Sequence, residues 1–535
     1  MPVFDYSTWI SHSETTAREL VAMGRQIPGF ARQPQISLLF VVSDPDEVWI
    51  KNTLDSVRRQ IYPRLEVCVC DNGSERAHVG GVLEGYAAVD ERIKIERLPE
   101  KKSWAEAHNA ALSSATGEFV AVLGQGDELA PDAMFRVAHL LQDVRADVVY
   151  TDEDHVDISG ERSDPSFKPY WSPELLLSRA YIGRLCAMRR SAVEAAGGFR
   201  EGLEGAEEHD LILRLSEETD RIYHVPGVLY HRSRWPGPTP DGDRTWASSR
   251  AVEDTINRRG EDATVEPAGS AWRVNWRLSG RPRVSVIVSA PEGAPAASSI
   301  NQLKRRTSHP IDQLIVASNA REASLTGDHV GHPFPARAMN LAAARADGEY
   351  LVFVSDRTQI TSSGWLEELL AQAQRQGVGA AGCKLLTAEG MLRHGGSFTN
   401  LGWLVGYANE REIEEDQALL WDPMFNFEVA SAECMVVRKA AFEDVGGFDD
   451  ERLPTALYDL DLSFRLQEKG LRNVYSPYAS LVCEAHELSP SVKEITYVWE
   501  RWWERLIRAS YYQRSPLHSN HRPADREALL ATLSS

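Results

Sequence analysis

An internal repeat constrains this chain more than any other feature. The stretch GEFVAVLGQGDEL at residues 117–129 returns as GEYLVFVSDRTQI at 348–360, so one apolar strand with a polar exit is present twice. MRRSAVEAAGGFRE at 188–201 matches VRKAAFEDVGGFDD at 437–450, and EEHDLILRLSE matches YDLDLSFRLQE. Because the matching pieces keep their order in both halves, the sequence predicts a duplicated domain rather than a short solenoid.

Each copy alternates apolar strands with helical stretches. In the first copy, SLLFVV, EVCVC and FVAVL are separated by DEVWIKNTLDSVRRQ and AEAHNAALSSA, which predicts a β-α-β-α-β series. Such a series folds as an α/β domain, with a mostly parallel sheet flanked by helices. Ligands of these sheets bind beyond the carboxyl ends of the strands, so the polar strand exits are the places to look for a site.

The length of 535 residues is too great for one ordinary domain. We expect an N-terminal helical segment at 1–34, a first domain at 35–265, a linker at 266–280, a second domain at 281–495, and a C-terminal helix and tail at 496–535.

Composition narrows the function. The net charge of −20 disfavours a nucleic-acid partner, because phosphate requires a basic surface. No apolar run reaches the roughly 18 residues that a membrane helix needs, and MPVFDYSTWISHSE lacks the basic region and apolar core of a signal peptide. The six cysteines contain no CxxC pair, so we expect reduced structural thiols in a cytoplasmic protein.

A series of motifs extends over nearly the whole chain. In order, it includes EVCVCDNGS, AEAHNAALSSATGEFVAVL, DELAPDA, VVYTDEDHVD, DPSFKPYWSPELLLS, YIGRL and EEHDLILRL, and then GEYLVFVSDRTQITSSGWLEELL and DLDLSFRL in the second copy. This series resembles the family 2 glycosyltransferases of the GT-A fold, and more narrowly the tandem-domain enzymes of bacterial O-antigen and surface-polysaccharide synthesis. The resemblance implies two tandem GT-A-like (Rossmann-like) domains.

The resemblance also implies a reaction. It implies hexosyl or deoxyhexosyl transfer from a nucleotide-sugar to a hydroxyl of a cell-surface glycan or a lipid-linked acceptor, with the first domain favoured as the catalyst. Family members hold Mg²⁺ or Mn²⁺ with an Asp-x-Asp pair at the tip of the repeated strand, because the departing diphosphate needs a cation. A carboxylate must also take the proton of the acceptor hydroxyl.

The strand tip of this chain departs from that pattern. Where the family reads roughly LDxDDEL, this sequence reads LGQGDEL, with Gly124 and Gly126 at the two aspartate positions. The second copy has Ser355 and Arg357 there. We therefore do not expect a divalent metal unless Asp127 helps to rebuild its site. Without a metal, the cations expected to meet a diphosphate are Lys101, Lys102, Arg232 and Arg234.

Several residues match functional positions of the family. Glu208, in EEHDL, matches the catalytic base. The predicted nucleotide-sugar-binding residues are Asp71, Asp127, Asp152, Asp154 and His231. In the second copy Ser318 replaces Asp71, and Asp356 and Asp459 are interpreted as vestigial.

Each assignment has a structural alternative. Asp71 lies in Asp-Asn-Gly, which favours an Asx turn, and the alternative for Asp127 is that it opens the following turn and helix, as acidic residues do. Glu208 and Asp459 also suit a solvated helix start. The TDEDH cluster suits a solvated loop, and His231 a structural hydrogen bond.

Two functional classes remain open. Asp71, Glu208 and the segment FKPYWSP favour an active enzyme. The glycines at the strand tip favour a non-catalytic pseudo-glycosyltransferase that binds a glycan or acts as a scaffold for a partner enzyme. Near the C-terminus, an apolar stripe on one helical face predicts packing onto the second domain, with peripheral association at the inner face of the membrane, or with a biosynthetic complex, as the alternative. The stripe consists of Trp499, Trp502, Trp503 and Leu506.

Overall fold

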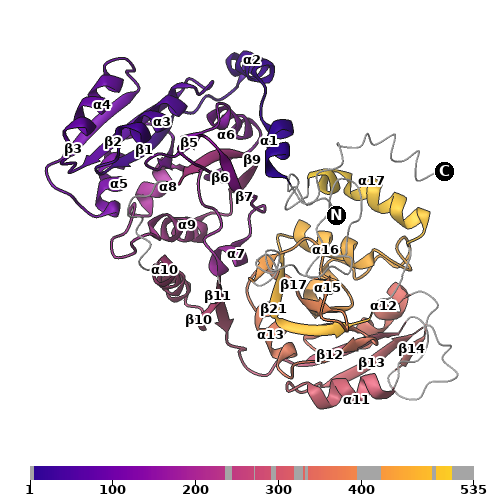
Figure 1. The fold of residues 1–535 in the computed structure, drawn as a ribbon. Helices are drawn as coiled ribbons and strands as arrows, with labels where there is room; N and C mark the ends of the chain where they lie inside the picture. Colours follow the sequence, from indigo (N-terminus) through magenta and orange to yellow (C-terminus); the bar gives the residue numbers. More distant parts are fainter. Residues whose placement is uncertain are drawn as a thin grey trace. The chain divides into compact units, whose positions relative to one another are not determined.

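A computed structural model describes residues 5–234, 244–269, 271–290, 297–318, 329–331, 335–394, 423–484 and 490–508. These residues form two compact units (Figure 1). Unit 1 contains the described residues up to Trp171 and those of Ala180–Glu261. Unit 2 contains Ser172–Arg179 and the described residues from Asp262 onward.

The sheet of unit 1 has the order β3-β2-β1-β4-β8-β6-β9-β5, with β7 paired to β6. Strands β3, β2, β1 and β4 are parallel, β8 is antiparallel to both of its neighbours, and β6 and β9 are parallel to each other. The strands are β1 Ile36–Val42, β2 Leu65–Asn72, β3 Ile93–Leu98, β4 Phe119–Leu123, β5 Glu128–Leu129, β6 Val148–Val156, β7 Arg162–Ser166, β8 Cys186–Arg189 and β9 Ile222–Ser233.

Helices flank this sheet, and every residue of β1, β2 and β4 is buried, as expected for strands covered on both faces. The helix α5 packs on β1 and β2 and begins with a capping box between Ser103 and Glu106. The helices of unit 1 are α1 Tyr6–Ser13, α2 Ala17–Gln26, α3 Glu47–Arg58, α4 Ala77–Ala87, α5 Trp104–Ser113, α6 Ala133–Asp143, α8 Arg190–Ala195, α9 Glu207–Glu218 and α10 Arg244–Arg259, with a short 3₁₀ turn at Ile27–Gly29.

Unit 2 repeats the same topology. Its sheet has the order β14-β13-β12-β15-β20-β17-β21-β16, which corresponds strand for strand to unit 1, and β18 pairs with β17 as β7 pairs with β6. The strands are β12 Val284–Ala290, β13 Gln313–Ser318, β14 His329–Gly331, β15 Tyr350–Ser355, β16 Thr358–Gln359, β17 Val378–Leu386, β18 Leu392–His394, β19 Phe425–Asn426, β20 Cys434–Arg438 and β21 Arg472–Cys483. The predicted duplication and the two α/β domains are confirmed, and each sheet combines a parallel half with a mixed half.

The helices of unit 2 include one from the first half of the chain. Helix α7 packs against β19 and against β11 (Ala271–Trp276), and its Glu174 pairs with Arg375 and Arg472, each at 3.2 Å. The helices are α7 Pro173–Ser178, α11 Ala297–Arg306, α12 Pro335–Arg345, α13 Trp365–Ala373, α15 Lys439–Asp444, α16 Tyr458–Glu468 and α17 Val492–Arg508.

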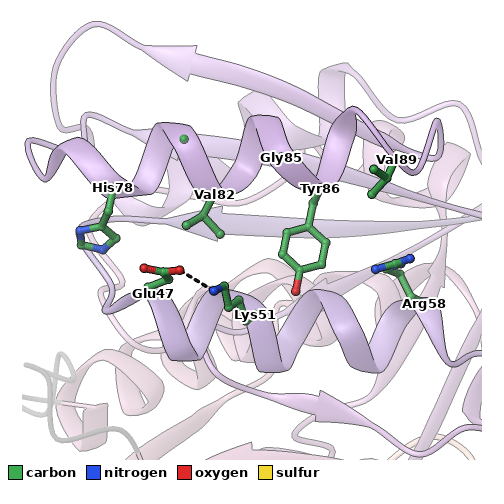
Figure 2. A pocket seen from close by; sticks show the side chains of 9 residues that line it. Glu47, Lys51, Arg58, His78, Val82, Gly85, Tyr86 and Val89 are labelled. Atoms are coloured by element: carbon green, nitrogen blue, oxygen red, sulfur yellow. Dashed lines mark ion pairs between the residues drawn. The ribbon is translucent and has the colours of Figure 1, made fainter.

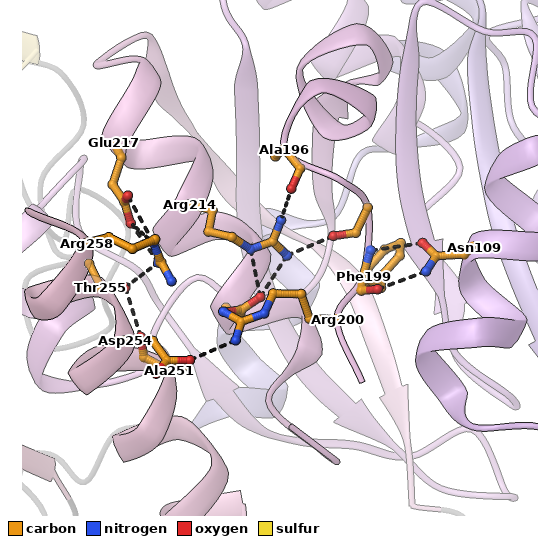
Figure 3. A network of polar contacts seen from close by, with 12 residues as sticks. Asn109, Ala196, Phe199, Arg200, Arg214, Glu217, Ala251, Asp254, Thr255 and Arg258 are labelled. Carbon is orange, nitrogen blue, oxygen red and sulfur yellow. Dashed lines mark hydrogen bonds and ion pairs between the residues drawn. The ribbon is translucent and has the colours of Figure 1, made fainter. Parts of the chain in front are cut away.

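A buried polar network recurs in the two units with the same hydrogen bonds, and Figure 3 shows it in unit 1. In unit 1, Arg214 pairs with Asp210 and donates to the carbonyls of Ala196 and Gly198. In unit 2, Arg465 pairs with Asp461 and donates to the carbonyls of Val445 and Gly447. The arginine thus satisfies the carbonyls of a glycine turn in both units.

The asparagines of the two copies also act alike. Asn109 bonds the main-chain N–H and C=O of Phe199 at 2.9 and 2.8 Å, and Asn340 bonds those of Phe448 at 3.0 and 2.8 Å. Each therefore fixes the turn that follows the short helix α8 or α15.

Two expected segments have definite structures. The range expected as the linker, 266–280, includes most of a β-hairpin formed by β10 Ala263–Ala268 and β11 Ala271–Trp276. The apolar stripe of α17 is buried in unit 2, since Trp499, Trp502 and Leu506 are 4%, 3% and 2% exposed. Trp502 also donates from its Nε1 to Asp461 at 3.0 Å. In the described part of the chain, no helix is long and apolar enough to cross a membrane.

Candidate active site at the tip of strand β4

The tip of β4 is closed to side chains. Gly126 has φ +80°, a left-handed conformation that favours glycine, and a Cβ there would lie 2.7 Å from Trp49 Cε3. A Cβ at Gly124 would collide with the carboxylate of Asp127 and the guanidinium of Arg184. Gly124 therefore makes room for an ion pair between Asp127 and Arg184, and Gly126 makes room for Trp49 and Ser233.

Arg184 is the centre of this site. Its Nη1 donates to Asp127 Oδ2 at 3.1 Å, and its Nη2 and Nε donate to Glu208 Oε1 at 2.6 and 3.0 Å. The three residues come from the turn after β4, the segment before β8 and the first turn of α9. One guanidinium thus bridges two carboxylates, with side chains of Arg184 and Glu208 that remain 23% and 26% exposed.

The main chain of Arg184 is held by hydrogen bonds with two buried side chains. Its N–H donates to Glu153 Oε2 at 2.7 Å, and its carbonyl accepts from Lys168 Nζ at 2.9 Å. Lys168, whose side chain is 1% exposed, also donates to the carbonyl of Ile182. The predicted segment FKPYWSP thus supplies a lysine that supports the arginine.

Asp127 is held in place by other bonds. Tyr230 donates its hydroxyl proton to Asp127 Oδ2 at 2.6 Å, and the Ser233 N–H donates to Oδ1 at 2.8 Å. The Gly124 N–H in turn donates to the Tyr230 hydroxyl at 2.9 Å. Burial, and then the charge of Asp127, raises the pKa of Tyr230 well above its ordinary value. Tyr230 is therefore a proton donor to Asp127, which serves as a fixed anchor for the guanidinium.

Arg184 and Glu208 each shift the pKa of the other. Burial alone would raise the pKa of Glu208, but the Arg184 guanidinium outweighs it and holds that pKa below its usual range. Burial alone would lower the pKa of Arg184, and the charge of Glu208 reverses this. Glu208 is therefore ionised near neutral pH, and its oxygens are occupied by Arg184 in this state.

Asp71 lies at the end of β2, separated from β4 by β1. Its Oδ1 accepts from the Ser74 N–H at 3.1 Å, and its Oδ2 lies 3.9 Å from Arg97 Nε. The residue makes the turn that its sequence favours, and among the described residues its Oδ2 has only this loose ion pair. Asp71 is 7% exposed.

Asp152 and Asp154 of the acidic cluster on β6 accept hydrogen bonds from other residues of unit 1. Asp152 accepts from His224 Nε2 at 2.8 Å and from the N–H groups of Lys168 and Gly227. Asp154 lies 2.7 Å from His231 Nδ1 and also accepts from Arg162 and Tyr6. Burial would raise the pKa of both aspartates, but the neighbouring histidines lower them. These contacts favour a supporting role for Asp152, Asp154 and His231, whose predicted part in nucleotide-sugar binding stays a prediction.

The cations proposed from sequence mostly have other partners. Arg234 pairs with Asp164 and Lys102 with Glu100, whereas Arg232 Nη1 lies 3.8 Å from Glu153. Lys101 is exposed. The cation at the strand tip is Arg184. It lies in the YIGRL motif, but the sequence motifs did not predict a role for it. An ungapped comparison of the two copies would have singled it out, because Glu433 occupies the same position in the second copy.

In the corresponding site of unit 2, an acidic residue stands at the position of Arg184. Glu433 pairs with Arg393 at 2.7 Å, and Asp459 accepts from the Ala432 N–H at 3.1 Å. Burial, with a contribution from Glu433, raises the pKa of Asp459 to about 6. Ser318 is 1% exposed at the end of β13, and the N–H of Asp356 donates to the carbonyl of Ser289.

The side chains at the tip of β4 do not fit a divalent metal. Gly124 and Gly126 offer no ligating atom, and both oxygens of Asp127 already accept hydrogen bonds. Within the described ranges, no group of three or more His, Cys, Asp and Glu side chains is arranged to hold a metal ion. A positively charged guanidinium stands instead beside Asp127, where it would repel a second cation.

A groove of about 480 Å³ lies elsewhere in unit 1, between α3 and α4 (Figure 2). Glu47 and Lys51 of α3 form an ion pair at its edge, and Val82 and Tyr86 of α4 face them. None of the candidate site residues lines this groove.

Residues 45–195 match the family model described as glycosyl transferase family 2. The chain carries a glycosyltransferase family 2 domain. The match covers β2, the tip of β4 and Arg184, whereas Glu208 lies beyond it. The geometry at Arg184 is therefore that of the glycosyltransferase domain in unit 1.

Two longer proteins are similar over most of the chain. The chain is 34% identical to the O-antigen biosynthesis protein RfbC of Myxococcus xanthus over 512 residues, which are 89% of this chain and 39% of RfbC. It is 30% identical to the uncharacterized protein y4gI of Sinorhizobium fredii over 510 residues, 88% of this chain and 56% of y4gI. The chain thus spans about two fifths and somewhat over half of these relatives' lengths.

A solved structure is also similar. The crystal structure of Staphylococcus aureus TarS 1–349 in complex with UDP-GlcNAc is 17% identical, covers 42% of this chain and 66% of that chain, and gives a TM-score of 0.36.

Proposed function

We propose that unit 1 transfers a sugar from a nucleotide-sugar to an acceptor hydroxyl, with Glu208 as the general base. The observation that carries this proposal is the position of Glu208: a partly exposed carboxylate at the start of α9, directly beside a cation at the tip of β4 in the family domain. The family match supports the reaction class, and this geometry supports the residue.

The reaction makes two demands on the protein. The acceptor oxygen forms a bond to the anomeric carbon of the sugar, and Glu208 takes the proton of the acceptor hydroxyl. The bond between that carbon and the phosphate oxygen breaks, and its electron pair leaves with the nucleoside diphosphate. The site must therefore offer a base and a group that stabilises the departing negative charge.

Asp71 is our proposed contact for the nucleoside. It stands two strands away from β4, a separation of roughly 10 Å at the usual strand spacing. A nucleoside at Asp71 would thus direct its diphosphate along the carboxyl edge of the sheet toward β4, where ligands of parallel sheets bind. Asp127 takes part by anchoring the cation at that edge.

The acceptor and the cellular setting are also proposals. The printed name of the Myxococcus relative supports a hydroxyl of a surface glycan or of a lipid-linked precursor as the acceptor. All six cysteines are free and buried, which supports a reducing cytoplasmic setting at the inner face of the membrane. Because the apolar stripe of α17 is buried, membrane association would have to use another surface or a partner in a biosynthetic complex.

The test is donor turnover by the purified chain. UDP-, GDP- and dTDP-sugars are supplied in turn with a lipid-linked glycan fraction, and release of nucleoside diphosphate is measured with and without Mn²⁺. We expect turnover with one donor and a loss of about 10²- to 10⁴-fold in Glu208→Gln. Asp147→Asn, which alters a carboxylate paired with Arg189 and Arg221, is the control. Nucleotide binding without turnover in every case would favour the non-catalytic scaffold.

A further inference from the structure

The guanidinium of Arg184 occupies the place from which a diphosphate has to be met. Arg184 lies where a side chain on Gly124 would project, directly at the tip of β4. Its side chain is 23% exposed, so a ligand at the strand edge can reach it. Guanidinium nitrogens bind phosphate oxygens through paired, charge-assisted hydrogen bonds.

The present partners of Arg184 are unequal. Asp127 is fixed by Tyr230 and Ser233, and it binds Arg184 through a single contact at 3.1 Å. Among the described residues, the carboxylate of Glu208 accepts hydrogen bonds from Arg184 alone, through three contacts of 2.6 to 3.3 Å. The guanidinium can therefore keep its contact to Asp127 while it exchanges Glu208 for another anion.

We propose that Arg184 is the resident cation of the donor site, and that it passes from Glu208 to the donor diphosphate when a nucleotide-sugar binds. The exchange meets the charge of the leaving group without a metal ion, and it frees the oxygens of Glu208 to accept the acceptor proton. This inference rests on the proposed function of unit 1.

The exchange couples two requirements of the reaction. Without donor, Glu208 is held by three hydrogen bonds and is a poor base. With donor, the diphosphate carries more negative charge than one carboxylate and competes for the same nitrogens. The base thus becomes available only when the leaving group has its cation, which protects the site from proton uptake in the absence of donor.

Unit 2 has no arginine at the position of Arg184. Glu433 holds the position of Arg184, and the neighbouring carboxylate is Asp459. An acidic side chain there would repel a diphosphate, so we assign the exchange to unit 1 alone.

The experiment measures binding of UDP, GDP and dTDP to the full chain by calorimetry, in EDTA and then with Mn²⁺. In the wild type we expect one diphosphate to bind equally well in both buffers. Arg184→Gln should weaken binding by about 10- to 100-fold, the usual effect of losing hydrogen bonds to a charged group. Glu208→Gln should tighten it by about 3- to 10-fold, because Arg184 is then released from its competitor.

Arg189→Gln is the matched control. Arg189 is 24% exposed and also bridges two carboxylates, Glu118 and Asp147, but it lies at the opposite end of β8 and should leave nucleotide affinity unchanged. If Arg184→Gln does not fold, Glu208→Gln decides the matter, since that variant retains the arginine and has a predicted gain in affinity.

The possible failures are distinct. Binding that requires Mn²⁺, or equal affinity in wild type, Arg184→Gln and Glu208→Gln, would overturn the exchange and leave the proposed function standing. Binding of none of the three diphosphates in either buffer would overturn both.

Discussion

Arg184 of unit 1 and Glu433 of unit 2 occupy the same position of the repeated sheet with opposite charges. Each precedes by the same number of residues the arginine that pairs with the first residue of the central strand, Arg189 opposite Phe119 and Arg438 opposite Tyr350. The two units therefore share the fold at this point but differ in the charge of one side chain. A cation lies beside Glu208 in unit 1, and an acid lies beside Asp459 in unit 2.

Nucleotide binding should be confined to unit 1. Asp71→Ala removes a carboxylate whose Oδ2 is only loosely paired, and we expect a loss of affinity of about tenfold for the bound nucleoside diphosphate. Ser318→Ala changes the matching position of unit 2 and should have no effect. Calorimetry of the two variants checks this, and similar losses in both would contradict the confinement.

The repeated arginines should stabilise their own units. Arg214→Ala leaves the buried Asp210 with one cation fewer and two carbonyls without a donor, which costs about 3–5 kcal/mol. Arg465→Ala should do the same in unit 2. Hydrogen exchange followed by mass spectrometry should show lost protection around α8 and α9 in the first variant, and around α15 and α16 in the second.

The control for these variants is Arg258→Ala. Arg258 pairs with Glu217 at 2.7 Å but is 32% exposed, so its removal should cost about 1 kcal/mol or less. If Arg214→Ala and Arg258→Ala lost equal protection, the buried network would not have the stabilising role assigned to it.

The sequence predicted the architecture well because the fold depends on features that recur along the chain. The strands β1, β2 and β4 are continuous apolar runs, and the repeat in Met188–Glu201 and Val437–Asp450 returns as the same glycine turn in both units. Between β1 and β4, the predicted series missed two elements, α4 and β3. Strand β3, IKIERL, is an edge strand in which three of the six residues are charged and at least partly exposed, so it does not read as an apolar run.

The site was harder to predict because it depends on contacts between residues that are far apart in the sequence. Arg184 lies 57 residues from Asp127 and 24 from Glu208 in sequence. The expectation of a metal-free site considered only cations near strand exits, and no periodicity marks Arg184. Likewise, Asp152 and Asp154 look like an exposed acidic run, but β6 is an interior strand, so both are almost completely buried and paired.

Unit 2 should lose stability as the pH rises through mild acidity. The pKa of Asp459 is raised to about 6 in the folded protein, chiefly by burial, from 3.8 in an unfolded chain. The folded state therefore binds the proton more tightly, so the stabilisation is fully present below about pH 4 and is lost as the pH rises to about 6. Denaturant unfolding of the wild type and of Asp459→Asn, compared across this interval, should show the loss only in the wild type. A parallel pH dependence of the two proteins would rule out Asp459 as its source.

The exchange of Arg184 should separate two pH profiles. Three basic groups face Glu208 in the free protein: Arg184, Arg232 of β9, and His108 of α5, whose own pKa burial lowers to about 4. Arg184 is the strongest of them and holds the pKa of Glu208 below its usual 4.5. When the diphosphate takes Arg184, burial is no longer offset, so the pKa of Glu208 rises in the donor complex.

Since a base must be ionised, activity falls as the pH drops through the pKa of Glu208. The acidic limb of kcat/KM, which reports the free enzyme, should therefore lie at lower pH than that of kcat, which reports the complex. In Arg184→Gln no exchange takes place, and the two limbs should coincide. Coincident limbs in the wild type would mean that Arg184 stays on Glu208 throughout turnover.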